Sequence, residues 1–216
     1  MEFVTHIIDL FLHIDTHLAE LVTDYGGWIY ALLFLIIFCE TGLVITPFLP
    51  GDSLLFVAGA LAGAALLDPN VLAASLIIAA ILGDALNYAI GRRVGPAVFE
   101  SGWSRFLKRE HLLRTQHFYE KHGGKTVVLA RFIPIIRTFA PFVAGIGRMS
   151  YGRFLRFNAF GALLWVTLFI YGGYLFGNMP AIKHNLSLVI LGIIILSITP
   201  GIIEYLRHRM AQTKSS

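Results

Sequence analysis

Two apolar segments of this chain carry charged residues and prolines where a plain membrane helix has no use for them. The first reads CETGLVITPFLPGD and holds two carboxylates, Glu40 and Asp52. The second, residues 126–147, reads TVVLARFIPIIRTFAPFVAGIG and holds Arg131 and Arg137. Prolines interrupt both segments, and a proline inside a helix removes a backbone hydrogen bond. The fold must therefore shelter charges and broken backbone within apolar surroundings.

Composition indicates which solvent the chain folds in. Of its 216 residues, 56% are hydrophobic and only 14% are charged. Soluble domains contain roughly one quarter charged residues. The sequence therefore predicts an all-α integral membrane protein with one membrane domain of about four to six membrane segments, and no nucleic-acid partner.

The basic residues predict the topology. All seventeen Lys and Arg lie between Arg92 and Lys214, whereas the first 91 residues hold nine of the thirteen acids. Loops rich in Lys and Arg stay in the cytoplasm. The basic loop 92–125, the stretch 148–156 and the C-terminal tail are therefore predicted to be cytoplasmic. Lys183 alone marks the opposite face.

This assignment makes residues 126–147 a re-entrant hairpin, because the loops on both sides of the segment are cytoplasmic. Counting back along the chain, residues 45–66 either span the membrane, which places the N-terminus outside, or form a second hairpin that enters from outside, which places the N-terminus in the cytoplasm. Two prolines and Gly51 stop a helix early in this segment and favour the hairpin. The residues expected to break the hairpins are Pro47, Pro50, Gly51, Pro134 and Pro141.

The two broken segments also resemble each other. TPFLPGDSLLFVAG and TFAPFVAGIG share a Thr, Pro, Phe, Gly order, and their opposite entry sides make them an inverted repeat. Non-helical backbone at membrane depth is tolerated only when it is buried in protein or lines a wet cavity. Paired Pro- and Gly-broken segments are the best sequence indication of a transporter's substrate site. The pattern therefore predicts a cavity between the hairpins.

The rest of the chain divides around this centre. Residues 1–25 predict an amphipathic helix that lies on the membrane or on the bundle. Residues 26–178 form the membrane domain, with spans at 28–44, 71–91 and 157–178. Residues 179–216 hold a final span, 186–206, and the cytoplasmic tail.

A possible metal-binding spacing and two pairs of glycines can each be interpreted in two ways. Asp9, His13 and His17 have a spacing that suits a metal ion, but a solvated helix face explains it as well, so no metal and no cofactor are expected. The pairs Gly59–Gly63 and Gly173–Gly177 suit close helix packing within the fold better than dimer formation. The sequence leaves open whether the chain forms a homo-oligomer.

Three long motifs carry a family resemblance. FCETGLVITPFLPGDSLLFVAGAL, GDALNYAIGRRVG and FYEKHGGKTVVLARFIPIIRTFAPFVAGIGRMS resemble the bacterial DedA family, whose members have a VTT (SNARE-associated) domain. The resemblance covers essentially the whole chain. It implies two re-entrant hairpins that face each other in a multi-pass protein of the bacterial cytoplasmic (inner) membrane.

The resemblance also implies a function. Members are implicated in proton-motive-force-dependent lipid transport, in which a flippase returns undecaprenyl phosphate or a related phospholipid across the membrane and supports envelope homeostasis. The family residues transfer to Glu40 and Asp52 on the acidic hairpin and to Arg131 and Arg137 on the basic one. Passive phospholipid scrambling and a non-transporting membrane-integrity scaffold are the alternatives.

The chemistry of these charges fits that function. Each charge at membrane depth costs at least about 2.5–3.5 kcal/mol, so a functional role is the default interpretation. Two arginines suit a lipid phosphate, because guanidinium groups bind phosphate oxygens in a bidentate manner. Only the carboxylates can exchange a proton, which makes Glu40 and Asp52 candidates for proton coupling. The simpler alternative is that acids and arginines pair and hold the hairpins together.

Asp84 is a third candidate for proton coupling. It lies in the predicted span 71–91, where it either belongs to the proton path or is held by Asn87 and Tyr88, one turn further on. Enzyme motifs are missing from the sequence: it contains neither H-E-x-x-H nor a lipid-phosphatase PSGH. We therefore expect no enzymatic activity; the expected partners are a lipid and protons.

The topology gives a first testable prediction. Reporter fusions at Ser216 and near Arg105 should be cytoplasmic, and fusions at Asp68 and Lys183 should be outside. The measurement is the activity of paired reporters that work on one side of the membrane only. A cytoplasmic signal at Asp68 would contradict the outer hairpin.

Overall fold

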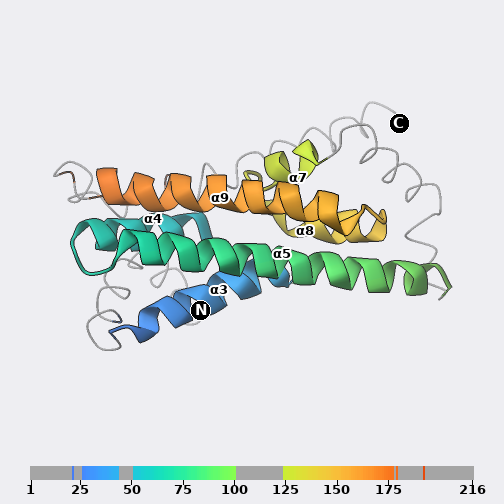
Figure 1. The fold of residues 1–216 in the computed structure, drawn as a ribbon, viewed down its shortest axis with the longest axis horizontal. Helices are drawn as coiled ribbons and strands as arrows, with labels where there is room; N and C mark the ends of the chain where they lie inside the picture. The colour runs from blue at the N-terminus through green and yellow to red at the C-terminus, as the bar shows by residue number, and fades with distance from the viewer. Residues whose placement is uncertain are drawn as a thin grey trace, which may run out of the picture.

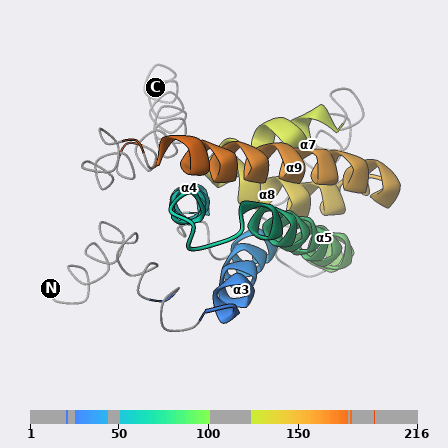
Figure 2. The ribbon, with the colours of Figure 1, turned by 60° about the vertical axis from the view of Figure 1, so that its left-hand side comes forward.

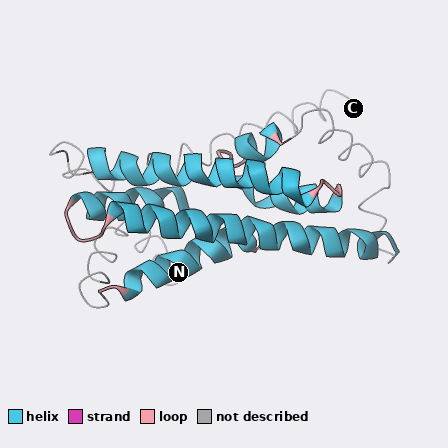
Figure 3. Cartoon of the chain, viewed as in Figure 1, coloured by secondary structure: helices cyan, strands magenta, loops and turns pink. Residues whose placement is uncertain are grey.

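A computed structural model describes residues 26–43, 51–100 and 124–177, together with Leu21, Met179 and Gly192; the side chains of 95–100, 134 and 135 are not included. Every regular element in these ranges is a helix, and none of the described residues lies in a strand (Figure 3). The all-α prediction is confirmed. Most of the predicted helix 1–25, the final span 186–206, and both Pro47 and Pro50 lie outside the described residues.

The described helices follow one another along the chain, joined by short turns or by segments outside the described ranges. They are α3 (Trp28–Gly42), α4 (Gly51–Gly63), α5 (Pro69–Glu100), α7 (Lys125–Ala130), α8 (Pro134–Ile146) and α9 (Tyr151–Phe176).

Helices α5 and α9 form the long axis of the molecule and run side by side in opposite directions (Figure 1). Among the described residues only Pro69–Val94 and Tyr151–Phe176 are long and apolar enough to cross a membrane, with 26 residues each. At 1.5 Å per residue each is about 39 Å long, which exceeds a hydrocarbon core of about 30 Å.

Both long helices extend beyond the predicted spans. Helix α5 continues to Glu100, so the basic loop does not begin at residue 92, and α9 begins at Tyr151 rather than at 157. The prediction was wrong because apolarity marks only the part of a helix that lies in hydrocarbon. The added turns of α9 carry the exposed Arg153 and Arg156, which a helix can carry into the polar headgroup layer.

The start of α5 follows directly from its sequence. Asp68 accepts hydrogen bonds from the backbone N–H groups of Asn70 (2.8 Å) and Val71 (2.9 Å), and so caps the helix. Pro69 follows at the first helical position, where its missing N–H costs nothing. Asp68 and Pro69 together therefore set where α5 begins.

Helices α4 and α8 have half the length of the two 26-residue apolar stretches. Each has 13 residues, or about 20 Å, and neither is long enough to cross a bilayer. They lie toward opposite ends of the long axis (Figure 1): α4 packs on α9, and α8 packs on α5.

Glycines let α4 approach α9 to backbone contact. A Cβ atom on Gly59 would overlap the carbonyl of Ile170, and a Cβ atom on Gly173 would overlap the carbonyl of Phe56. This contact confirms that Gly59 and Gly173, one glycine from each predicted pair, serve helix packing within the fold.

The crossing of α8 and α5 uses the same contact. A Cβ atom on Gly145 would overlap the carbonyl of Tyr88, and one on Gly91 would overlap the carbonyl of Phe142. In both crossings the short helix contributes the sequence FVAG, at 56–59 and at 142–145, and the long helix contributes a glycine three residues after the carbonyl. The two crossings are therefore built alike.

The C-termini of α4 and α8 are also built alike. The N–H of Leu66 bonds to the carbonyl of Leu61, and the N–H of Met149 bonds to the carbonyl of Ala144, both at 3.1 Å. These six-to-one bonds define the Schellman motif, which needs one residue in a left-handed conformation. Those residues are Ala65 (φ 62°) and Arg148 (φ 52°).

Helix α3 packs on α5, on the side away from α9 (Figure 1 and Figure 2). Its buried face, which includes Leu33 and Ile37, joins one apolar cluster with residues of α4, α5 and α9. Its outer face exposes Trp28 and Leu35, and α9 exposes Leu168. Large apolar side chains on the outside of a bundle suit a lipid environment.

The crossing of α4 and α9 gives the second prediction. Gly173→Ala should lower the free energy of unfolding by about 1–3 kcal/mol, because its Cβ meets backbone that cannot turn aside. Gly172→Ala is the matched control: nothing lies within 4 Å of its Cβ, and alanine favours the helix by about 0.5–1 kcal/mol. Unfolding in detergent measures both variants. Equal stability of the two would contradict the close crossing.

Candidate functional site

Three helix ends bring one arginine and two carboxylates together. Glu40 lies in the last turn of α3, Asp52 in the first turn of α4, and Arg137 in the first turn of α8. Pro134 occupies the first turn of α8 and fixes where the helix begins. We call these three residues the Arg137 cluster.

In the Arg137 cluster, one arginine forms ion pairs with two carboxylates. Nη2 of Arg137 lies 2.5 Å from Oε1 of Glu40, and Nη1 lies 2.7 Å from Oδ1 of Asp52. Glu40 is 1% exposed and Arg137 6% exposed, so neither charge is solvated by water. Nε of Arg137 is buried and has no hydrogen-bond partner among the described residues. A buried donor without a partner calls for an explanation, and a bound ion is one of those that native structures offer.

The helix ends make this an unfavourable place for two of the charges. A helix N-terminus is positive and a C-terminus is negative, each effect being worth about 0.3–1 kcal/mol. Arg137 lies at an N-terminus and Glu40 at a C-terminus, so each is repelled by its own helix. The N-termini of α4 and α8 both point at this cluster, which gives it the positive potential of an anion site.

Gly51 makes room for Glu40. A Cβ atom at position 51 would overlap the Glu40 carboxylate, so α4 begins in contact with that acid. The predicted break at Gly51 is thus located at the site. Pro141 is a correction: it lies inside α8, and the helix continues to Ile146. Proline removes only one hydrogen bond, the one to the carbonyl of Arg137, and the remaining turns hold the helix.

A second arginine forms a separate group, the Arg131 cluster of Arg131, Asp84 and Asn158. Arg131 follows α7, where the chain turns into α8, and its Nη2 pairs with Oδ2 of Asp84. The same nitrogen donates to Oδ1 of Asn158 at 3.1 Å. Asn158 in turn donates to the carbonyl of Ile81 at 3.1 Å, which links α9 to α5.

The alternative in which Asn87 and Tyr88 hold Asp84 is wrong. Asn87 donates to the carbonyls of Thr41 (3.1 Å) and Thr138 (2.8 Å), and Tyr88 donates to the carbonyl of Met149. Helix spacing would have allowed the contact, but Asp84 points across to Arg131 instead. Asn87 instead joins the ends of α3 and α8 to α5.

Trp165 joins the two clusters and was missed in the sequence. Its Nε1–H donates to Oδ1 of Asp52 at 2.9 Å. The guanidinium carbons of Arg137 and Arg131 lie 5.0 Å and 5.8 Å from its ring centre. The sequence did contain a signal for Trp165: tryptophans in membrane helices are enriched at the two interfaces, and Trp165 lies in the middle of its span. Asn158 was a second signal, because it places a polar amide two turns earlier on the same helix face.

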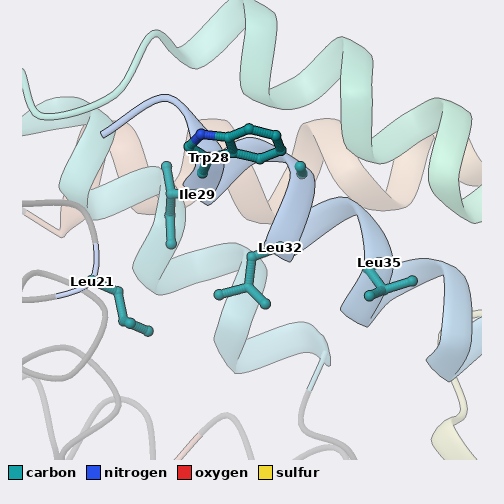
Figure 4. Close-up of a pocket in the computed structure, with 6 residues that line it drawn as sticks. Leu21, Trp28, Ile29, Leu32 and Leu35 are labelled. Atoms are coloured by element: carbon teal, nitrogen blue, oxygen red, sulfur yellow. The ribbon is translucent and has the colours of Figure 1, made fainter. Parts of the chain in front are cut away.

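The described residues also line an apolar hollow of about 500 Å³ on the outer face of α3 (Figure 4). Its lining consists of Leu21, Trp28, Ile29, Ala31, Leu32 and Leu35. No charged side chain lines it, so it suits hydrocarbon and not a lipid headgroup. The predicted metal candidates Asp9, His13 and His17 lie outside the described residues.

Comparisons with known proteins point to one family. The family model of the VTT domain matches residues 49–175. Protein DedA of Escherichia coli (strain K12) is 58% identical over 218 residues, which cover 100% of both chains. The uncharacterized membrane protein ML0287 of Mycobacterium leprae (strain TN) is 44% identical, covering 84% of this chain and 81% of the relative.

A third relative extends the comparison. The inner membrane protein YqjA of Escherichia coli (strain K12) is 36% identical over 154 residues, 71% of this chain and 70% of the relative. No solved structure matches the chain. The chain belongs to the DedA family of membrane proteins, which carry the VTT domain.

The Arg131 cluster gives the third prediction. Arg131→Gln should lower the free energy of unfolding by about 3–5 kcal/mol, because it leaves the Asp84 carboxylate buried without its counter-ion. The double variant Arg131→Gln/Asp84→Asn should recover much of this loss. Arg153→Gln, at an exposed position of α9, is the control for removal of one positive charge. Additive effects of the two cluster substitutions would contradict the pair.

Proposed function

We propose that this protein is a lipid transporter of the bacterial cytoplasmic membrane, driven by the proton motive force. Its cargo would be undecaprenyl phosphate or a related phospholipid, and its role the homeostasis of the cell envelope. One observation carries the proposal: a buried arginine is shared by two carboxylates at the point where two half-length helices begin.

We also infer that α4 and α8 are arms of two re-entrant hairpins related by an inverted repeat. Their length supports this, as does their position toward opposite ends of the long helices (Figure 1). So do the matched FVAG crossings and the matched C-terminal caps. Transporters of this design bind their substrate near the midplane, where broken helices from both halves meet.

The phosphate would bind at Arg137. Its guanidinium presents a planar fork of donors, and the N-termini of α4 and α8 add positive potential. Arg131 faces the same tryptophan ring and can contribute a second guanidinium. The carboxylates already occupy these donors, so the phosphate would have to displace them. Binding of the lipid and release of a carboxylate from Arg137 would therefore occur together.

Charge balance couples that exchange to protons. Glu40, Asp52 and Asp84 face only two arginines, so three acids and two bases leave one negative charge unmatched. A carboxylate released by Arg137 is a second uncompensated charge at membrane depth, and a proton neutralises it. Glu40 and Asp52 are therefore the proposed coupling groups, with Asp84 as the next candidate.

The proposed membrane location comes from the relatives, and the proposed orientation comes from the distribution of basic residues. The name of YqjA places that relative in the inner membrane, and we extend this location to the present chain. Both termini and the basic segment 92–125 would face the cytoplasm. The apolar outer face of α3, with its hollow, offers a surface for the hydrocarbon chains of the lipid (Figure 4).

The fourth prediction tests the coupling. In vesicles that contain labelled undecaprenyl phosphate or labelled phospholipid, a pH gradient should accelerate transport by the wild type. Glu40→Gln or Asp52→Asn should still move lipid but lose that acceleration, because an amide keeps the shape of the acid and cannot exchange a proton. Asp68→Asn is the control, since this exposed acid lies in a turn and asparagine caps a helix as well as aspartate does.

Each outcome separates the alternatives. Transport that ignores the gradient in the wild type would favour a passive scramblase. No lipid movement at all would favour a membrane-integrity scaffold. Full gradient dependence in both amide variants would remove the proton role from Glu40 and Asp52 and leave Asp84.

A further inference from the structure

Trp165 lies between the two charge clusters in the interior of the protein. It sits in the middle of α9, and none of its surface is exposed. Asn158, seven residues earlier and therefore on the same helix face, holds Arg131. One face of α9 thus contacts both arginines.

The hydrogen bond of Trp165 goes to an atom that Arg137 also uses. Oδ1 of Asp52 accepts from Nη1 of Arg137 at 2.7 Å and from Nε1 of Trp165 at 2.9 Å. Indole nitrogen can only donate, so this bond needs an acceptor oxygen. Trp165 and Arg137 therefore share a single carboxylate oxygen.

The ring of Trp165 serves the arginines as well. Arg137 lies 5.0 Å and Arg131 5.8 Å from the ring centre, within the range of cation–π attraction. Such contacts hold a guanidinium group without using any of its N–H donors. Both arginines are therefore kept close to one neutral surface that occupies none of their N–H donors.

We propose that Trp165 is a positioning residue for the phosphate of the lipid; this inference rests on the proposed function. When Arg137 turns from Asp52 to the phosphate, the oxygen it leaves keeps the Trp165 hydrogen bond. For as long as Asp52 stays ionised, that bond strengthens, because it no longer competes with the guanidinium for the same oxygen. Trp165 thus lowers the cost of exchanging a carboxylate for a phosphate, and its ring keeps both guanidinium groups at the site.

Binding of dodecyl phosphate to the purified protein in a neutral detergent tests this role. Trp165→Phe keeps an aromatic ring but removes the N–H, and should raise the Kd about tenfold, as expected for loss of a hydrogen bond to a charged group. Trp28→Phe, at an exposed position of α3, is the matched control and should bind like the wild type. Unfolding of each variant is measured alongside.

A spectroscopic test reports on Trp165 itself. The chain has three tryptophans, so Trp28→Phe with Trp103→Phe leaves Trp165 as the only one. Dodecyl phosphate should change the emission of Trp165 in a saturable way, because the guanidinium group next to the ring changes its position. Dodecanol, which lacks the phosphate, should leave the emission unchanged. The same titration with Arg137→Gln added should lose the response.

The outcomes distinguish this inference from the proposal beneath it. If the wild type binds dodecyl phosphate and Trp165→Phe binds it equally well, Trp165 has no positioning role, even if the variant is less stable. If the wild type binds no dodecyl phosphate, the phosphate site itself is wrong, and both proposals fall. An emission change that dodecanol reproduces would also overturn the role of Trp165.

Discussion

The ion pairs of Arg137 hold the centre of this protein together. The guanidinium joins the end of α3, through Glu40, to the starts of α4 and α8, so three helices meet at one charge. Arg137 and Glu40 are each disfavoured by their own helix dipole, and only Asp52, in the first turn of α4, is favoured. A buried ion pair also often does little better than an apolar contact of the same size. Stability alone therefore gives little reason for this arrangement. The physical argument favours a site that exchanges ionic partners, and this is the basis of the proposed transport.

Glycine packing is what allows such a centre to form. At the crossing of α4 with α9 and of α8 with α5, backbone meets backbone without intervening side chains. The short helices are thereby held against long ones that are able to cross the bilayer, and their N-termini are left facing the Arg137 cluster. Two structural solutions recur in both halves, the FVAG crossing and the left-handed cap after the short helix. Their recurrence is the strongest support for the proposed inverted repeat.

The Arg131 cluster and Trp165 extend the group of buried polar contacts beyond Arg137. Arg131 is not a spare copy of Arg137, because it has its own acid, Asp84, and its own amide, Asn158. Trp165 contacts both arginines and hydrogen-bonds to Asp52, so one side chain of α9 links the two clusters. The proposed phosphate exchange would accordingly involve α9 as well as the two short helices.

The sequence by itself determined the class of protein and pointed to four charges that the structure buries. Apolar composition, prolines and intramembrane charges are local properties, and they identified Glu40, Asp52, Arg131 and Arg137 without a structure. It misjudged helix ends, because hydropathy measures contact with hydrocarbon and not the length of the helix. Only the tertiary structure decided the pairing: Asp84 belongs to Arg131, and Arg137 is shared by Glu40 and Asp52. Partners 47 to 97 residues apart depend on how helices cross, and a linear pattern does not contain that geometry.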